Sequence, residues 1–283
     1  MSRIAYVNGS YVPHDEAYVH IEDRGYQFSD GVYEVAAIKN GKLIDGARHL
    51  DRLWRSMEEL QIAAPMARAP MEVVLKEVVR QNRILEGIVY IQVTRGVARR
   101  DHAFPSFTRP ALVMTAKRLS YDAVYKKAQS GIKVTSVPDI RWDRCDIKSI
   151  SLLPNVLAKQ TAREAGSVEA VMFDKDGMIT EGSSTNVWMV TKDGTLVTRS
   201  TKDNILPGIT RQCVMELAEE NQMKVEERAF SLLEVADAAE IFITSTTSCA
   251  MPVIQFDDTV IGDGKPGPVA LRLINAYMDF MNS

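Results

Sequence analysis

The sequence of 283 residues has little cysteine and no strong excess of charge of either sign. Its three cysteines, Cys145, Cys213 and Cys249, form no CxxC pair, so they predict reduced thiols rather than a disulfide framework. A net charge of −3, from 34 basic and 37 acidic residues, argues against a surface for nucleic acids or anionic membranes. No apolar run approaches the roughly 20 residues that span a bilayer, and the N-terminus has no apolar signal-peptide core. We therefore expect a cytoplasmic protein that binds neither nucleic acid nor membrane.

The common metal and nucleotide motifs are also missing. The histidines His14, His20, His49 and His102 fall in no HExxH or similar spacing, so we expect no metal site. There is no Walker A sequence and no GxSxG elbow. Residues 262–267 match GxGxxG, but a dinucleotide site needs a complete βαβ unit with an acidic residue about 20 positions further on. The stretch therefore predicts a hairpin turn that leads into a helix.

Length and composition predict about two globular domains, at roughly 150 residues each. Hydrophobic residues make up 46% and charged residues 25%, which suits domains that have a core of their own. We expect a mixed α/β (α+β) architecture with an N-terminal domain over 1–119, a polar linker over 120–130 and a C-terminal domain over 131–283. Ligand sites favour the cleft between two such domains.

Hydrophobic periodicity predicts the individual elements. Leu50, Leu53, Met57 and Leu60 recur every three or four residues, which indicates a helix with one apolar face. The strands are expected over 4–9, 87–96, 111–119, 132–137, 169–173 and 239–245, hairpins over 186–198 and 252–264, and the helices over 49–62, 71–82, 152–166, 208–222 and 268–281.

Lys148 is the first candidate for chemistry, because it stands between Ile147 and Ile150 ahead of an apolar helix start. Apolar surroundings disfavour the charged form of a lysine, so its pKa falls and its amine becomes nucleophilic. The segment alone favours the ordinary alternative, a lysine that reaches the surface from a strand end.

A second candidate stretch places Glu181 just after an expected strand, before Gly182 and the hydroxyl residues Ser183, Ser184 and Thr185. The carboxylate could pair with a protonated heterocyclic nitrogen, and the hydroxyls and amides could hold polar ligand atoms. A capped turn explains the same composition equally well.

Two further stretches could bind an anion. Pro207 and Gly208 lead into a helix, so the amides of Ile209 and Thr210 present the positive end of the helix dipole. The run 244–248 offers several hydroxyls at the end of a strand. The structural alternatives are an N-capped helix and a threonine-rich strand end. Together, a lysine, a carboxylate and two phosphate cradles are what a pyridoxal phosphate site needs.

Seven short motifs, taken in order along the chain, resemble the fold-type IV pyridoxal-phosphate aminotransferases, and within them the D-amino-acid aminotransferases. The motifs are EDRGYQFSDGVYE (Glu22 to Glu34), HLDRL (His49 to Leu53), QVTRG followed by RRDHAFP, RCDIKS, TEGSSTN, GITR and TSTTS. The resemblance covers essentially the whole chain. It implies the two-domain fold of that family, with the cofactor in the interdomain cleft and its lysine in the C-terminal domain.

The resemblance also implies a role for each candidate residue. Lys148 would form the Schiff base with pyridoxal 5′-phosphate and move the substrate Cα proton, and Glu181 would contact the pyridine nitrogen. Leu206 would pack on one face of the ring. The cofactor phosphate would be bound by Arg52, Ile209, Thr210, Ser245 and Thr246.

In the D-amino-acid branch, a tyrosine and an Arg-x-His pair bind the substrate carboxylate, and these map onto Tyr33, Arg100 and His102. If the segment is extended, Arg100 and His102 share a face and Arg99 points away. Without the family, the segment is read as a charged loop. The pair is similar to one that the neighbouring subunit supplies, so a homodimer is implied.

The implied reaction is transamination of D-amino acids with 2-oxo acids, of the type D-alanine plus 2-oxoglutarate to pyruvate plus D-glutamate. The alternatives on the same fold are an L-branched-chain aminotransferase, an R-amine transaminase and an aminodeoxychorismate lyase. A cofactor-free binding module is the alternative from another class of protein. The Arg100 and His102 pair favours D-amino acids, because a simple amine needs no carboxylate clamp.

Overall fold

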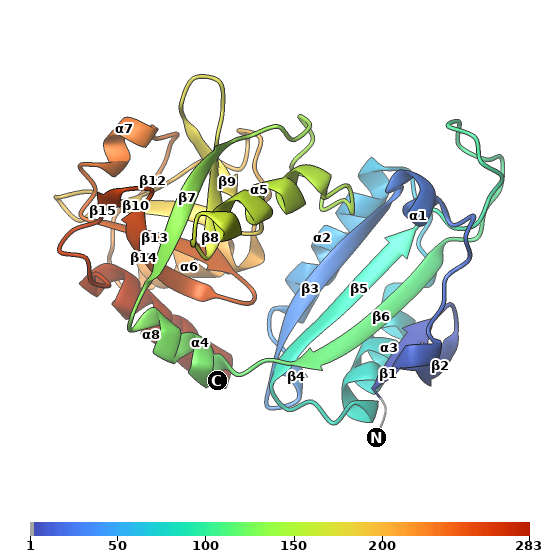
Figure 1. Cartoon of the computed structure of the whole chain (residues 1–283). Coiled ribbons are helices and arrows are strands. Elements are labelled where there is room, and N and C mark those ends of the chain that lie inside the picture. Colours follow the sequence, from blue (N-terminus) through green and yellow to red (C-terminus); the bar gives the residue numbers. More distant parts are fainter. Residues whose placement is uncertain (1–2) are drawn as a thin grey trace. The chain divides into compact units, whose positions relative to one another are not determined.

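The computed structural model describes residues 3–283, which divide into two compact units (Figure 1). The first unit contains the residues up to Ser120 together with Ile147–Ser151. The second unit contains Tyr121–Asp146 and Leu152–Ser283.

A six-stranded antiparallel sheet forms the first unit, with the strand order β2-β1-β6-β5-β3-β4. Its strands are β1 (Ile4–Val7), β2 (Ser10–Pro13), β3 (Gly31–Lys39), β4 (Lys42–Leu43), β5 (Gly87–Thr94) and β6 (Ala111–Arg118). The helical segments of the unit are the 3₁₀ turn η1 (His14–Glu16), α1 (Arg24–Phe28), α2 (Gly46–Glu59) and α3 (Arg68–Gln81).

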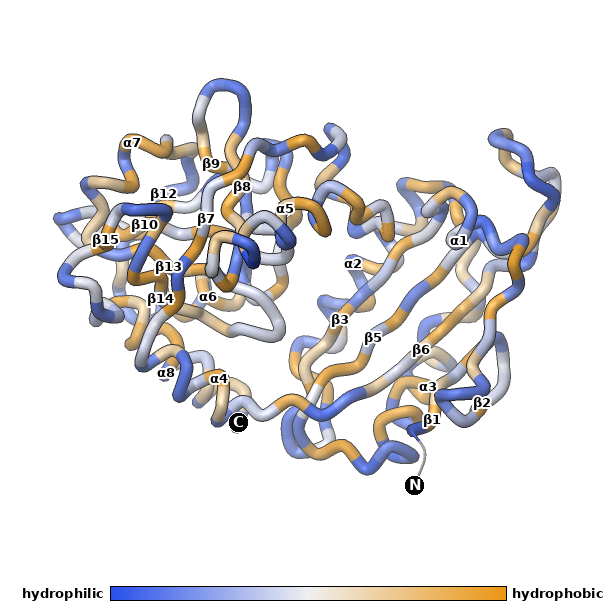
Figure 2. Tube along the Cα trace, viewed as in Figure 1, coloured by the Kyte–Doolittle hydropathy of each residue, from blue (hydrophilic) through white to orange (hydrophobic). Residues whose placement is uncertain are grey.

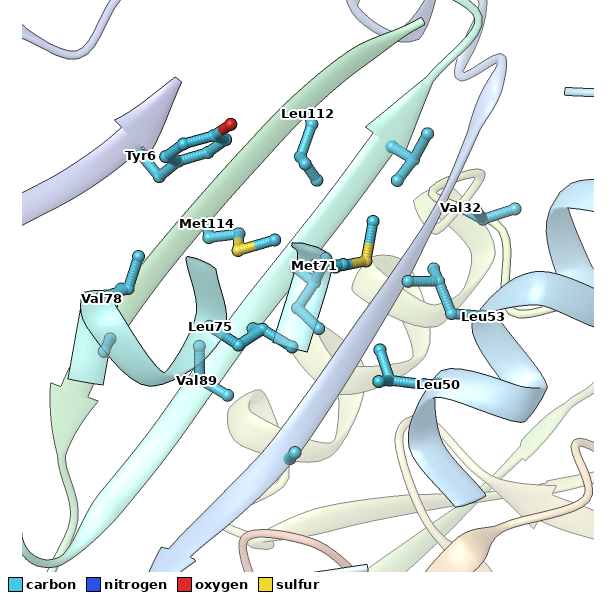
Figure 3. Close-up of a cluster of buried hydrophobic side chains, with 14 of the residues drawn as sticks. Tyr6, Val32, Leu50, Leu53, Met71, Leu75, Val78, Val89, Leu112 and Met114 are labelled. Carbon is cyan, nitrogen blue, oxygen red and sulfur yellow. The ribbon is translucent and has the colours of Figure 1, made fainter. Parts of the chain in front are cut away.

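The core of the first unit lies between this sheet and the helices α2 and α3. Leu50 and Leu53 of α2 and Leu75 of α3 approach the buried face of the strands (Figure 3). The predicted apolar face of α2 is confirmed for Leu50, Leu53 and Met57, which are buried, whereas Leu60 lies at the C-cap and is partly buried. Burying each such side chain contributes about 1.5–3 kcal/mol to stability. Hydrophobic positions recur along β5 and β6 (orange in Figure 2), in keeping with strands that have one face in this core.

The second unit is built on a nine-stranded mixed sheet with the strand order β12-β11-β10-β13-β14-β7-β8-β9, in which β15 pairs with β14. Its strands are β7 (Ile132–Pro138), β8 (Glu169–Phe173), β9 (Ile179–Gly182), β10 (Asn186–Val190), β11 (Leu196–Thr198), β12 (Val225–Glu227), β13 (Glu240–Ser245), β14 (Cys249–Phe256) and β15 (Thr259–Val260). Its helices are α4 (Tyr121–Ala128), α5 (Leu153–Glu164), α6 (Ile209–Glu220), α7 (Leu232–Val235) and α8 (Pro268–Asn282).

The start of α8 explains the GxGxxG match. The carboxylate of Glu240 accepts hydrogen bonds from the amides of Val269 (2.9 Å) and Ala270 (2.8 Å). A Cβ on Gly267 would lie 2.0 Å from the carboxyl carbon of Glu240, so a larger residue there would push this carboxylate off the amides that it caps. The amides that would receive a pyrophosphate are therefore used to cap the helix, which confirms the prediction of a turn and a helix start.

Two parts of the expected domain division differ from the structure. The segment expected as a linker contains α4, because Tyr121 and Ala128 share one helix face and are fully buried against the second unit. Lys148, expected with the C-terminal domain, groups with the first unit. Its segment pairs with the start of β3, where Tyr33 N–H donates to the carbonyl of Lys148 (3.0 Å) and Ile150 N–H donates to that of Gly31 (3.0 Å).

Residues 3–283 agree with the absence of membrane, metal and disulfide motifs from the sequence only in the following respects. No helix there is both long and apolar enough to cross a membrane. No group of three or more histidine, cysteine or acidic side chains in this range is placed to hold a metal ion. Cys145, Cys213 and Cys249 are buried and form no disulfide.

Candidate active site

Lys148 lies beside β3 with its side chain over an aromatic ring. Its amide donates to Ser56 Oγ of α2 (3.3 Å), and its Nζ lies 4.2 Å from the centroid of the Tyr33 ring. The side chain is half-buried, and no carboxylate in residues 3–283 forms an ion pair with it. The backbone of Lys148 is therefore held by Tyr33 of β3 and by Ser56 of α2, and these two contacts fix the position from which its side chain extends.

The ring of Tyr33 is itself supported by a second tyrosine. Tyr90 of β5 stacks on it with ring centroids 5.7 Å apart, and the Tyr90 hydroxyl donates to Gln92 (2.7 Å). Burial, together with the proximity of Tyr33, raises the pKa of Tyr90 to about 12, so this hydroxyl stays protonated. Tyr33 is thus held in place between Tyr90 and Lys148.

Arg52, expected to bind a phosphate, is buried on α2 and pairs with a carboxylate that the sequence analysis missed. Its Nε and Nη2 donate to the two carboxylate oxygens of Glu34 (2.6 and 3.0 Å), and His49 Nδ1 lies 2.7 Å from Glu34 Oε2. Burial alone would raise the pKa of Glu34, but the charge of Arg52 and hydrogen bonds from His49 and Arg52 lower it to about 2. Successive side chains of a strand point to opposite faces of its sheet. Because Glu34 follows Tyr33 directly, this alternation could have predicted that Glu34 lies on the other face of β3, towards α2.

The Glu34 cluster predicts a loss of stability in acid. Because the folded pKa of Glu34 is about 2 and its ordinary value is 4.5, its contribution is complete above about pH 5. It is lost as the pH falls towards 2, and amounts to about 3 kcal/mol in the free energy of unfolding. In urea titrations, the stability difference between wild type and Glu34→Gln should therefore shrink between pH 7 and pH 3.

Glu77 provides a matched control for this prediction. Hydrogen bonds from Arg80 and Gln81 lower its pKa to about 2 as well, but Glu77 is only partly buried on α3 and its partner Arg80 is exposed. Solvent and salt screen such a surface pair, so at pH 7 Glu77→Gln should change stability far less than Glu34→Gln does. A wild-type to Glu34→Gln difference that stays constant with pH would show that Glu34 is not held ionised by its partners.

Arg100 and His102 lie in an exposed irregular loop rather than in an extended strand. They nevertheless meet on one aromatic side chain. The Arg100 guanidinium carbon lies 4.7 Å from the centroid of the Phe28 ring, and the His102 ring centroid lies 5.4 Å from it. The two residues thus gather around Phe28 without the strand geometry that the sequence analysis assumed.

Glu181, expected to meet a ring nitrogen, is buried in β9 and paired with Arg141. One Nη of Arg141 donates to Glu181 Oε1 and the other to Asp139 Oδ2 (2.7 Å). Burial raises the pKa of Glu181, while the charge and hydrogen bond of Arg141 act against it. Burial also lowers the pKa of Arg141, but Glu181 and Asp139 outweigh this and raise it, so Arg141 stays charged. Arg141 was not among the predicted site residues, although it lies only seven positions before Lys148.

Asn186 connects Glu181 to the turn before α6. Its Nδ2 donates to Glu181 Oε2 and to the carbonyl of Leu206, both at 3.0 Å. The amide of Leu206 donates back to Glu181 (3.1 and 3.2 Å). A Cβ on Gly208 would lie 2.0 Å from Asn186 Oδ1, so a larger residue at this turn would displace the Asn186 side chain. The structure therefore brings Glu181 and Leu206 together at the entry to α6.

Helix α6 begins at Ile209, and Gly208 at its N-cap supplies no side-chain hydrogen bond. Within residues 3–283, no side chain at the N-cap of α6 binds its first amides, whereas Glu240 binds those of α8. Amides at the start of a helix favour a negatively charged ligand. The expected anion cradle at Ile209 and Thr210 has the local geometry for that role.

The hydroxyl residues after Gly182 serve a structural role in part. Both Ser183 and Ser184 donate to the carboxylate of Glu169, the second at 3.1 Å. The hydroxyl of Thr185 is buried and has no hydrogen-bond partner among residues 3–283. Ser183 and Ser184 therefore stabilise the turn, as the capped-turn interpretation predicts. The buried hydroxyl of Thr185 stabilises neither the turn nor a neighbouring strand through a hydrogen bond to residues 3–283.

Ser245 and Thr246 lie at the turn between β13 and β14. Ser245 Oγ lies 2.6 Å from Ser248 Oγ and accepts a hydrogen bond from the Ser248 amide (3.2 Å). Tyr121 of α4 donates to the carbonyl of Thr246 (3.3 Å). This turn is stabilised by its own side chains.

The candidate residues therefore form two sets, one in each unit. The first unit holds Tyr33, Arg52, Arg100, His102 and Lys148. The second unit holds Glu181, Leu206, Ile209, Thr210, Ser245 and Thr246. Arg52 and Lys148 lie on one side of α2, since Ser56, one turn after Arg52, binds the amide of Lys148.

The chain belongs to the class IV aminotransferase family. The family model for amino-transferase class IV matches residues 31–256. Among individual proteins, the D-alanine aminotransferase of Bacillus licheniformis is 43% identical over 272 residues, which cover 96% of this chain and 95% of that protein. The D-alanine aminotransferase of Staphylococcus haemolyticus is 38% identical over 279 residues, 98% of each chain.

Solved structures agree with the mixed α/β fold that the resemblance predicted. A T.th. branched-chain amino acid aminotransferase complexed with N-(5′-phosphopyridoxyl)-L-glutamate is 26% identical, with a TM-score of 0.90 over 99% of this chain and 94% of that one. The branched-chain amino acid aminotransferase of Escherichia coli has a TM-score of 0.92 with the same coverage. At 23% identity, the second likeness concerns the fold alone.

Proposed function

We propose that this chain is a pyridoxal 5′-phosphate-dependent aminotransferase that exchanges the amino group between D-amino acids and 2-oxo acids. The observation that carries the proposal is the 43% identity with a D-alanine aminotransferase along nearly the full length of both chains. Family membership supports the reaction class, and a cytoplasmic location stays a prediction from the sequence.

The side chains present fit this cofactor. Glu181 is a buried carboxylate suited to a protonated ring nitrogen, and the amides at the start of α6 suit a phosphate. Lys148 is an amine that no carboxylate neutralises among residues 3–283. We assign the covalent link to Lys148, the ring nitrogen to Glu181 and one ring face to Leu206. The phosphate contacts are assigned to Arg52, Ile209, Thr210, Ser245 and Thr246.

Bound pyridoxal phosphate supplies an electron sink for a substrate that loses its Cα proton. Lys148 Nζ takes that proton and later returns it, because one positioned amine can serve as base and then as acid. Glu181 holds the proton on the ring nitrogen, and Arg141 and Asn186 hold Glu181. The tether of Lys148 to β3 fixes the direction from which the proton leaves.

Selection of the D enantiomer is assigned to Tyr33, Arg100 and His102, which bind the substrate carboxylate. A guanidinium forms two parallel hydrogen bonds to a carboxylate, which fixes the orientation of Cα as well as its position. The carboxylate and Lys148 together determine which hydrogen is removed. Moving the carboxylate to the other side of the pocket would select the L enantiomer.

A homodimer in which Arg100 and His102 serve the neighbouring subunit is part of the proposal. Its support is a set of large apolar side chains that are exposed in the first unit, near α1 and the loop of Arg100. These side chains are Tyr18, Ile21, Tyr26, Phe104 and Phe107. They belong to two short stretches of the sequence, and exposed apolar surface is typical of contact with another protein.

The second candidate function is transamination of L-amino acids, because the similar solved structures include branched-chain amino acid aminotransferases. The observation behind it is the 26% identity with the T.th. enzyme, well below the 43% identity with the D-alanine aminotransferase. The lyase and amine alternatives have no specific observation in their favour. Parallel assays with D-alanine, L-leucine and 1-phenylethylamine separate the three transaminase activities, and release of pyruvate without a 2-oxo acid identifies the lyase.

The direct test is a visible spectrum of the protein loaded with pyridoxal phosphate. Adding D-alanine should bleach the yellow form, because the amino group passes to the cofactor, and adding 2-oxoglutarate should restore it. L-alanine at the same concentration is the control. Bleaching by L-alanine or L-leucine but not by D-alanine would reject the proposed stereochemistry, and a protein that stays colourless would reject the cofactor.

A further inference from the structure

The loop that carries Arg100 and His102 has little backbone support of its own. Residues 99–104 are exposed, and no backbone amide of residues 99–107 donates to a backbone carbonyl within the described chain. An exposed segment of this kind needs side-chain contacts if it is to keep one conformation.

The side chain of Arg24, in α1, supplies hydrogen bonds to the backbone of this loop. Its Nη1 donates to the carbonyls of Asp101 (2.6 Å) and Ala103 (3.3 Å), and its Nη2 donates to that of His102 (3.3 Å). The side chain is 3% exposed. One buried guanidinium therefore binds three consecutive carbonyls around His102.

The orientation of the Arg24 guanidinium is fixed by Asp30. Arg24 Nε donates to Asp30 Oδ2 (2.7 Å), and Arg95 donates to both oxygens of the same carboxylate (2.7 and 3.0 Å). Arg95 also binds the carbonyls of Leu60 and Gln61, at the end of α2 (2.7 and 2.8 Å). Asp30 thus joins α1, the base of the loop and the end of α2.

Phe28 transmits this arrangement to the two functional side chains. The guanidinium carbon of Arg24 lies 4.9 Å from the centroid of the Phe28 ring, and that of Arg100 lies 4.7 Å from it. The ring of His102 packs against Phe28 as well. Arg24 thus contacts both the backbone of the loop and the aromatic ring on which Arg100 and His102 rest.

We propose that Arg24 is a positioning residue for the substrate carboxylate: it holds residues 101–103 so that Arg100 and His102 are aligned for binding. The inference rests on the proposed function, because it takes Arg100 and His102 as the carboxylate-binding pair. A lysine cannot replace Arg24, since a single ammonium cannot reach Asp30 and three carbonyls in the planar geometry of a guanidinium.

The test compares Arg24→Lys, Arg100→Ala and the double variant in the cofactor-loaded protein. Arg24→Lys should raise KM for D-alanine and the inhibition constant of propionate by roughly 10- to 100-fold, since a displacement of about 1 Å can cost about 100-fold. The affinity for pyridoxal phosphate should stay at the wild-type value. Arg24→Lys should raise KM by a smaller factor in the Arg100→Ala background than in wild type, because only the alignment of His102 is then left to lose.

Limited proteolysis gives a readout that is independent of activity. Trypsin should cut after Arg99 or Arg100 several-fold faster in Arg24→Lys than in wild type, because the loop loses its carbonyl contacts. Arg80→Lys is the control: Arg80 is exposed on α3 and pairs with Glu77, so its replacement should change neither KM nor the cleavage rate.

The outcomes separate this inference from the function it rests on. An unchanged KM in Arg24→Lys, together with a raised KM in Arg100→Ala, overturns the role of Arg24 alone. Additive effects in the double variant, or an unchanged cleavage rate, overturn it too, because Arg24 would then act apart from the loop. An unchanged KM in Arg100→Ala removes the proposed carboxylate site, and the role of Arg24 with it.

Discussion

Replacing Lys148 by alanine is expected to reduce the transamination rate by about 10⁴-fold, the upper end of what a positioned acid or base contributes. The variant loses both the covalent link to the cofactor and the amine that lies over the ring of Tyr33 and moves the Cα proton. The fold should persist, because the hydrogen bonds that hold residue 148 come from its backbone. The measurements are turnover with D-alanine and the visible spectrum of the loaded protein.

Two further variants show whether a loss of activity belongs to the amine of Lys148. Lys148→Arg keeps a cation near Tyr33 but supplies no neutral amine, so it should be as inactive as Lys148→Ala. Lys192→Ala removes an exposed lysine that pairs only with the exposed Asp237, and it should behave as wild type. Borohydride reduction of the loaded wild type should fix the cofactor on the peptide that contains Lys148. Retained turnover in Lys148→Ala, or label on another lysine, would contradict the assignment.

Replacing Arg100 by alanine is expected to weaken the binding of 2-oxo acids and D-amino acids by roughly 100- to 1,000-fold. A hydrogen bond to a charged group is worth about 1.5–3 kcal/mol, and a guanidinium can offer two to one carboxylate. The dissociation constant for pyridoxal phosphate should change little, because none of the phosphate contacts is assigned to the loop. KM for both substrates and a fluorescence titration with the cofactor measure the two effects.

Arg99 is the natural control, because it precedes Arg100 in the same exposed loop and carries the same charge. Arg99→Ala should leave KM near the wild-type value if the position of the guanidinium, and not the local charge, binds the carboxylate. Equal losses in Arg99→Ala and Arg100→Ala would indicate general electrostatic attraction. Equal losses of substrate and cofactor affinity in Arg100→Ala would mean that its role is misassigned.

Local patterns were enough to predict most elements of the fold. The spacing of Leu50, Leu53 and Met57 gave the correct apolar face of α2, because helix periodicity depends only on neighbours in sequence. The segment around Tyr121 was mistaken for a linker because its polar composition concealed two buried positions on one helix face. Its burial is a tertiary effect that composition does not record.

The candidate site was predictable only where chemistry is concentrated in short motifs. The partners of its charged residues were not, because they come from distant segments: Glu34 reaches Arg52 across the sheet–helix interface, and Arg141 reaches Glu181 across 40 positions. Arg24 belongs to the motif EDRGYQFSDGVYE, but nothing in the neighbouring sequence indicates that its side chain binds the backbone of residues 101–103. Such pairings depend on strand register and on burial, and a single sequence states neither.

The return of Ile147–Ser151 to the first unit has a consequence for the order of folding. The polypeptide passes from one unit to the other three times, after Ser120, Asp146 and Ser151. A fragment that stops at residue 120 leaves the amide of Tyr33 and the carbonyl of Gly31 without the partners they have in the complete chain. During synthesis, these backbone partners of the first unit become available only after residues 121–146 of the second unit have been made. Lys148 lies in Ile147–Ser151, which is the last segment of the first unit to be synthesised.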